Sequence, residues 1–157
     1  MPKPPKALEP KKHLLASSLA SAEKAVKTLS RTYEKAKPYL KELKSDELSL
    51  DADDVFETLT SRFSRLADIL TQKVFRAIDA VELIEEGSIL DRFNRAEKRA
   101  IIDSADTWAE IRDLRNSIAH DYAEKNLNEL RERAFKFIPA LLTAFEKSKA
   151  YASKLTP

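Results

Sequence analysis

The sequence predicts an all-α protein built as an up-and-down helical bundle. The chain of 157 residues has one glycine and seven prolines, while hydrophobic residues make up 43% and charged residues 34% of it. A single glycine disfavours a protein rich in hairpins, and a chain of this length can bury one ordinary core. Apolar residues also recur at spacings of three and four, as on helices with one buried face. We expect four to five helices in a single domain over residues 13–155.

The N-terminal segment "MPKPPKALEPKK" departs from this pattern. It holds four prolines and four lysines in 12 residues. Such a composition favours a flexible arm, so we expect residues 1–12 to lie outside the folded domain. A basic arm could contact RNA or a partner protein, but a solvated tail is the simpler interpretation.

A long first helix is expected from Leu15 onward. Its apolar residues alternate at spacings of four and three, which is typical of a bundle helix or of a helix paired between subunits. Pro38 falls within this pattern and should kink the helix or end its regular part. The expected inward residues are Leu15, Leu19, Ala22, Val26, Leu29, Tyr33, Ala36, Leu40 and Leu43.

The segment "SLDADDVF" predicts the start of a second helix. Ser49 and the aspartates that follow it offer capping oxygens and a charge that favours a helix N-terminus. This helix should end at Gly87, since glycine readily takes the left-handed conformation found at helix ends. The expected inward residues are Val55, Leu59, Phe63, Leu66, Leu70, Val74, Ala77, Val81 and Ile84.

The rest of the chain predicts a short helix and two longer ones. Ser88 or Asp91 can cap the short third helix, and Ser104 or Asp106 can start the fourth. The segment "NLNELRERAFKF" then opens the last helix. Its expected inward residues are Leu127, Leu130, Ala134, Phe137, Leu141 and Phe145.

The fourth helix ends in "LRNSIAHDY", residues 114–122, which concentrates polar chemistry beside a buried face. Ile111, Leu114 and Ile118 define that face at helical spacing, with Trp108 at its edge. Arg115 falls close to the same edge. Since an unpaired buried guanidinium is costly, Arg115 needs an acidic partner, a phosphate group or a hydrated groove.

Asn116 and His120 are four residues apart and share the neighbouring face of this helix. A straight helix separates Arg115 from His120 by roughly 140°. The two side chains can therefore converge only around the rim of a groove, across a symmetric dimer, or where the helix ends. Each possibility places a specific demand on the fold.

These residue types suit work on a phosphodiester. An arginine binds phosphate oxygens with its planar fork, and a histidine moves a proton near neutral pH. The reaction needs both a general acid and a general base, and the motif has only one histidine. A two-fold dimer with both motifs in one cleft would supply two histidines. The common alternative is a helix-end cap and an ion pair. No metal site is expected, because the other histidine, His13, lies at the arm and the chain has no cysteine.

The stretch "RNSIAHDY" has the pattern Arg-x4-His-x-Tyr and is similar to the signature of HEPN-domain toxins of the HepT type. Genes for such toxins lie beside those for minimal nucleotidyltransferase antitoxins of the MntA type. The resemblance extends to "SRFSRLADILTQKVFRAID" and "DRFNRAEKRAIIDSADTWAEIRDL" in order and spacing. It covers most of the chain, from the start of the first expected helix into the last.

The resemblance implies a bundle that dimerises with the motifs facing each other and acts as an endoribonuclease without a metal ion or cofactor. Arg115 would bind and stabilise the scissile phosphate, His120 would be the general acid or base, and Asn116 would be an accessory polar residue. The nucleotidyltransferase partner would transfer AMP from ATP to Tyr122. The added bulk and negative charge would then block the RNA cleft.

Two other functions fit the same residues. The chain could be a non-catalytic HEPN module that docks a nucleotidyltransferase, or a purely structural dimer in which Arg115 is buried and ion-paired and His120 is inaccessible. The lack of cysteine, of a signal peptide and of a membrane-length apolar run favours a cytoplasmic protein without a membrane partner. A formal net charge of +2 restricts any RNA site to a local basic groove.

Overall fold

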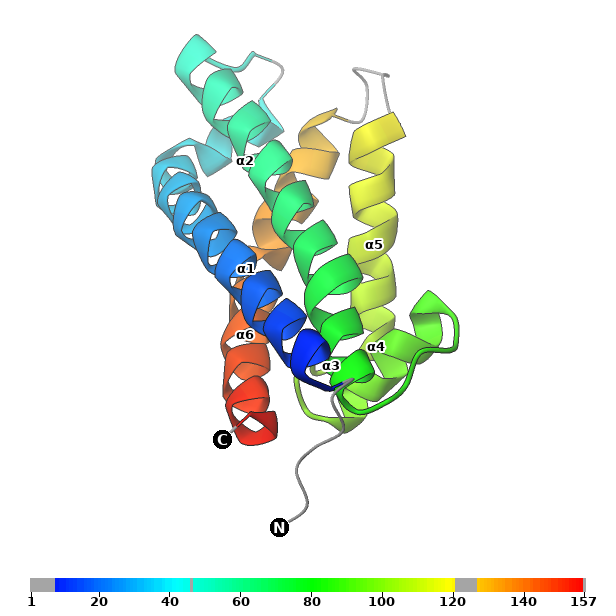
Figure 1. Cartoon of the computed structure of the whole chain (residues 1–157). Helices are drawn as coiled ribbons and strands as arrows, with labels where there is room; N and C mark the ends of the chain where they lie inside the picture. The colour runs from blue at the N-terminus through cyan, green and yellow to red at the C-terminus, as the bar shows by residue number, and fades with distance from the viewer. Residues whose placement is uncertain (1–7, 46, 121–126, 157) are drawn as a thin grey trace.

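The computed structural model describes residues 8–45, 47–120 and 127–156, and within these ranges its only secondary structure is helical, with no strand. In chain order the elements are α1 (Leu8–Ala36), the 3₁₀ helix η1 (Lys37–Lys44), α2 (Leu50–Asp68), the π-helix η2 (Ile69–Val74), α3 (Phe75–Val81), α4 (Ile89–Lys98), α5 (Ala105–His120) and α6 (Leu127–Leu155). Figure 1 shows α1, α2, α5 and α6 running alternately up and down, with α4 as a short addition at one end. The predicted fold class, an all-α bundle, is confirmed. No described helix is long and apolar enough to cross a membrane.

Helix α1 begins earlier than the sequence predicted. Residues 8–12, which we assigned to the arm, form the first turns of α1. Pro10 is accommodated there because the N–H groups of the first turn have no partner within the helix. Lys11 pairs with Glu85 at 2.8 Å and so fastens this turn to the segment after α3. Residues 1–7 lie outside the described residues.

The buried face of α1 is partly shifted from the predicted one. Ser18, Ala25 and Thr32 are buried, and these small residues allow neighbouring helices to approach closely. Leu19 and Val26, which we expected to point inward, are only partly buried on the flank of the core. As predicted, the α-helical part ends before Pro38, which lies in the first turn of η1.

Helix α2 starts where the sequence predicted, but the helix that follows is not uniform. The Ser49 hydroxyl accepts a hydrogen bond from the Ala52 backbone N–H at 3.2 Å, so Ser49 is the N-cap. About five turns later the backbone changes from α to π geometry over Ile69–Val74 and then returns to α geometry in α3. The periodicity of the apolar residues gave no indication of this insertion.

The end of α3 corrects the predicted role of Gly87. The helix ends at Val81, and Leu83, not glycine, takes the left-handed conformation with φ 66°. The Ile84 N–H donates to the Asp79 carbonyl at 2.8 Å and the Leu83 N–H donates to the Ala80 carbonyl at 3.0 Å, which is the Schellman pattern. Ala100, with φ 58°, ends α4 in the same way. Gly87 also has a positive φ, but it lies in the loop that leads into the next helix.

The caps of the later helices match the prediction. Ser88 and Asp91 form a reciprocal capping box at the start of α4. The Ser104 hydroxyl accepts from the Thr107 N–H at 3.2 Å at the start of α5.

In α6 the predicted inward face is shifted toward Ile138, and Leu127 is exposed at the first turn. The fully buried side chains of α6 include Ala134, Ile138 and Leu141.

Candidate active site

Helix α5 presents the polar motif at the edge of the core. Trp108, Ile111 and Leu114 are buried, and the Trp108 ring lies 5.1 Å from Phe75 and 6.1 Å from Phe93 between ring centroids. We had expected Trp108 at the edge of the buried face, but it lies inside the core. This anchorage fixes the rotation of α5 about its axis. The residue after Leu114 consequently emerges beside the end of α2.

Arg115 is held by Asp68, the last residue of α2. Its Nε donates to Asp68 Oδ1 at 2.7 Å and its Nη2 donates to Oδ2 at 2.8 Å. These hydrogen bonds raise the pKa of Arg115, so the guanidinium is charged at any physiological pH. The two side chains are 31% and 44% exposed, respectively, so the pair is only partly buried. An arginine has five N–H donors, and the two at Nη1 form no hydrogen bond to another described residue.

A hollow of about 330 Å³ opens beside this ion pair. Helix α5 contributes Arg112, Arg115 and Asn116 to its wall. The opposite wall consists of Ala67, Asp68, Thr71 and Gln72, from the end of α2 and the π-helix η2. Positive and hydrogen-bonding groups therefore converge on an open space large enough for a phosphate group.

The π-helix positions one wall of this hollow. A π segment shifts the hydrogen-bonding register and leaves a backbone carbonyl without its usual partner. In η2 the Thr71 carbonyl accepts a hydrogen bond from Arg92 Nη1, from α4, at 3.1 Å. Arg92 thus supports the element that carries Thr71 and Gln72.

Asp68, Thr71 and Gln72 are the site residues that the sequence did not identify. The need of Arg115 for an acidic or phosphate partner was predicted, but Asp68 lies 47 residues earlier in the chain. No spacing rule links α2 to α5, so the sequence did not distinguish Asp68 from several other acidic residues as the partner of Arg115. The register shift in η2 had no signal in the sequence.

His120 is placed apart from Arg115 within one chain. It is the last residue of α5, is exposed, and does not line the hollow that contains Arg115 and Asn116. This agrees with the angular separation expected on a straight helix. Tyr122, the candidate modification site, lies outside the described residues.

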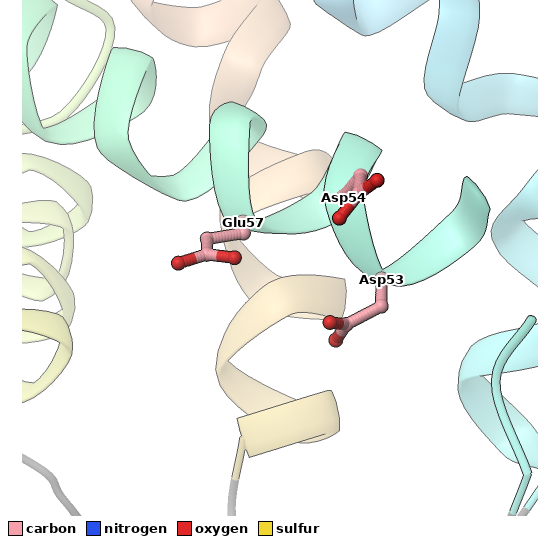
Figure 2. A group of neighbouring side chains, drawn as sticks. All are labelled: Asp53, Asp54 and Glu57. Atoms are coloured by element: carbon pink, nitrogen blue, oxygen red, sulfur yellow. The ribbon is translucent and has the colours of Figure 1, made fainter. Parts of the chain in front are cut away.

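A group of three carboxylates stands elsewhere on α2. The carboxylate oxygens of Asp53, Asp54 and Glu57 lie within 4.8 Å of one another, and no other such grouping occurs in the described part of the chain. Figure 2 shows them along the first turns of α2. Asp53 already accepts a hydrogen bond from Arg131 of α6 at 2.9 Å. The Arg131 guanidinium already neutralises part of the negative charge of this group, so we assign no metal ion here.

Comparison with known proteins places these residues in a family. The model of a family described as "Ribonuclease HepT-like" matches residues 29–148, which include Asp68 and the whole motif from Arg115 to Tyr122. A search of curated proteins gave no match, and a search of solved structures gave none either. The match covers well over half of the chain. The chain therefore belongs to the HepT-like ribonuclease family.

Proposed function

We propose that this protein is the toxin of a toxin–antitoxin pair and cleaves RNA without a metal ion, with Arg115 and His120 as its catalytic residues. The observation that carries the proposal is the arrangement of Arg115. Asp68 holds two of its donors, and the rest of the guanidinium borders an open hollow that also contains Asn116. A structural ion pair would not need such a hollow. His120 is exposed, which a purely structural role would not require.

The chemistry is transfer of a phosphoryl group within the RNA strand. The 2′-hydroxyl loses its proton and attacks the adjacent phosphorus, the bond to the 5′-oxygen breaks, and that oxygen gains a proton. The products are a 2′,3′-cyclic phosphate and a 5′-hydroxyl. Arg115 would stabilise the negative charge that builds up on the phosphate oxygens, and His120 would transfer one of the protons. Asn116 would help to orient the phosphate.

We further propose a two-fold dimer in which both copies of the motif line one cleft. The motif supplies a single histidine, whereas the reaction needs a group that removes a proton and a group that donates one. In the described structure His120 and Arg115 do not line the same hollow. A second copy related by a two-fold axis brings another His120 toward the scissile phosphate.

The regulation that we propose acts on Tyr122. A nucleotidyltransferase antitoxin would transfer AMP from ATP to its hydroxyl, releasing pyrophosphate. Tyr122 follows His120 by two residues, so the attached phosphate and nucleoside would lie beside the catalytic cleft. Their negative charge and bulk would exclude an RNA phosphate from that position.

The decisive experiment is RNA cleavage by purified wild-type protein and by His120→Ala in the presence of EDTA. We expect wild type to cut RNA and leave cyclic phosphate ends, and His120→Ala to be slower by about 10²- to 10⁴-fold, the usual contribution of a general acid or base. His13→Ala is the matched control, because it removes the chain's other histidine from an exposed position on α1. It should cleave like wild type.

Two results would contradict the ribonuclease proposal. The first is equal cleavage by wild type and His120→Ala, which points to a contaminating nuclease. The second is RNA left intact by wild type that still forms a stable complex with a nucleotidyltransferase. That outcome would make the protein a docking module.

A further inference from the structure

A second polar hollow, distinct from the one at Arg115, lies between α3 and α4. Its volume is about 560 Å³, and three arginines line it, namely Arg76, Arg92 and Arg95. The backbone of Gly87 closes one side, and a Cβ atom there would lie only 3.3 Å from Arg95 Nη1. No aromatic ring belongs to its described wall, so the hollow offers charge and hydrogen bonds without a surface on which a base can stack.

Most carboxylates around this hollow already have cationic partners. Asp79 is buried and is bound by Arg95 at 2.8 Å and by Arg99 at 2.6 Å. Glu85 is paired with Lys11. Glu86 remains, exposed at the rim. In the described part of the chain, neither Arg76 nor Arg92 forms an ion pair.

Arg92 is the group whose bonding needs are least met. Its Nη1 donates to the Thr71 carbonyl at 3.1 Å, but its Nε is buried and has no hydrogen-bond partner among the described residues. Burial lowers the pKa of Arg92, and the positive charges of Arg76 and Arg95 lower it further against the opposing effect of Asp79. Like charges gathered around one hollow repel one another, and an anion bound there would relieve that repulsion.

The two hollows are connected through the π-helix. Arg92 borders the second hollow and contacts Thr71, which lines the hollow at Arg115. Gln72 lines the hollow at Arg115 and also a groove that it shares with Lys73 and Arg76. Arg76 lines both this groove and the second hollow, so neighbouring hollows share residues from Arg115 to Arg92.

We propose that the hollow between α3 and α4 binds a backbone phosphate of the RNA strand whose scissile phosphate lies at Arg115. This inference rests on the proposed ribonuclease function. The arginines would bind phosphate through charge and hydrogen bonds, and the missing stacking surface makes the site indifferent to the base. Arg76 and Arg92 are therefore determinants of substrate binding, remote from the bond that breaks.

The test measures binding of a fluorescently labelled RNA oligonucleotide to protein carrying His120→Ala, which prevents cleavage during the measurement. Arg76→Gln and Arg92→Gln are added singly. Each should weaken binding several-fold and reduce the slope of log Kd against log salt by about 0.7, the value for one phosphate contact on a single strand. Lys136→Gln is the matched control, because Lys136 is exposed on α6 and lines neither hollow.

Arg76→Gln is the decisive variant, since Arg76 is exposed and its loss leaves the hydrogen bond of Arg92 to η2 intact. The inference is overturned if both arginine variants bind RNA like Lys136→Gln with an unchanged salt slope. It is also overturned if they lose affinity for AMP while RNA binding is unaffected, because the hollow would then hold a free nucleotide. Should wild type fail to cleave RNA but bind it in an Arg76-dependent manner, the ribonuclease proposal fails and the phosphate site stands.

Discussion

The orientation of one guanidinium connects the fold to the proposed chemistry. Arg115 emerges at the core edge because Leu114 beside it is buried, and Asp68 then fixes the plane of its side chain with two hydrogen bonds. A bidentate pair sets direction as well as position. A phosphate approaching the remaining N–H groups would meet a donor that is already aligned, so little of its binding energy would be lost in ordering the side chain.

We predict that Asp68→Asn lowers the rate of RNA cleavage by about tenfold or more, because a small misplacement of a catalytic group is costly. The loss should appear mainly in kcat, and the midpoint of thermal unfolding should change little, since partly exposed ion pairs contribute only about 0–1 kcal/mol to stability. Steady-state kinetics and thermal unfolding of the same preparations measure the two effects.

Asp54→Asn is the control for this substitution. It removes a carboxylate from the same helix at an exposed position away from the hollow. If Asp68→Asn cleaves RNA as fast as Asp54→Asn, or faster, Asp68 does not position Arg115. A faster variant would instead mean that Asp68 competes with the RNA phosphate for the guanidinium.

For Tyr122 we predict a covalent change that intact-mass spectrometry detects. Incubation with ATP, Mg²⁺ and a nucleotidyltransferase encoded beside this gene should add one or more AMP units, and the modified protein should no longer cleave RNA. Tyr122→Phe should keep its original mass and stay active. Addition of AMP to Tyr122→Phe, or full activity after modification of wild type, would remove this mechanism.

At the scale of the helices, local chemistry made most starts predictable and several ends unpredictable. Ser49, Ser88 and Ser104 are caps whose short hydroxyl side chains bond to backbone groups only a few residues away, so the sequence identifies them. Leu83 and Ala100 end their helices in the left-handed conformation, which is unfavourable for L-residues. The Schellman hydrogen bonds offset that cost, and residue types do not reveal them.

The candidate site was predictable only on the side that belongs to α5. Arg115, Asn116 and His120 stand within a few residues of one another, and helical geometry alone separates Arg115 from His120. Asp68 and the η2 residues reach the site through the packing of α2 against α5. That arrangement depends on the summed contacts of the core, and the side-chain pattern of either helix by itself does not determine it.

At the scale of the whole molecule, the proposed dimer makes a quantitative prediction. When wild-type and His120→Ala subunits are co-expressed in equal amounts and associate at random, a cleft that needs both histidines is intact in about a quarter of the dimers. Cleavage activity per total protein should fall to that level. Subunits that act independently would retain about half.

The same mixing with His13→Ala subunits should leave activity at the wild-type level. Differently tagged subunits allow the mixed dimers to be purified and assayed directly. A mixed dimer with half or more of the wild-type activity would contradict a shared cleft. A protein that sediments as a monomer at assay concentrations yet cleaves RNA would do the same.

The π-helix within the α2–α3 rod has one further consequence, which concerns helical phase. Asp68 and Asp79 are 11 residues apart, and in an unbroken α-helix they would point in nearly the same direction, about 20° apart. One residue inserted by π geometry rotates the second relative to the first by about 100°. Asp68 therefore meets Arg115 on α5, while Asp79 meets Arg95 on α4 and Arg99 directly after it. A single continuous rod thus serves two neighbours. If η2 adopted α geometry without any change in chain length, both acids would point to one side and one set of arginines would lose its anchor.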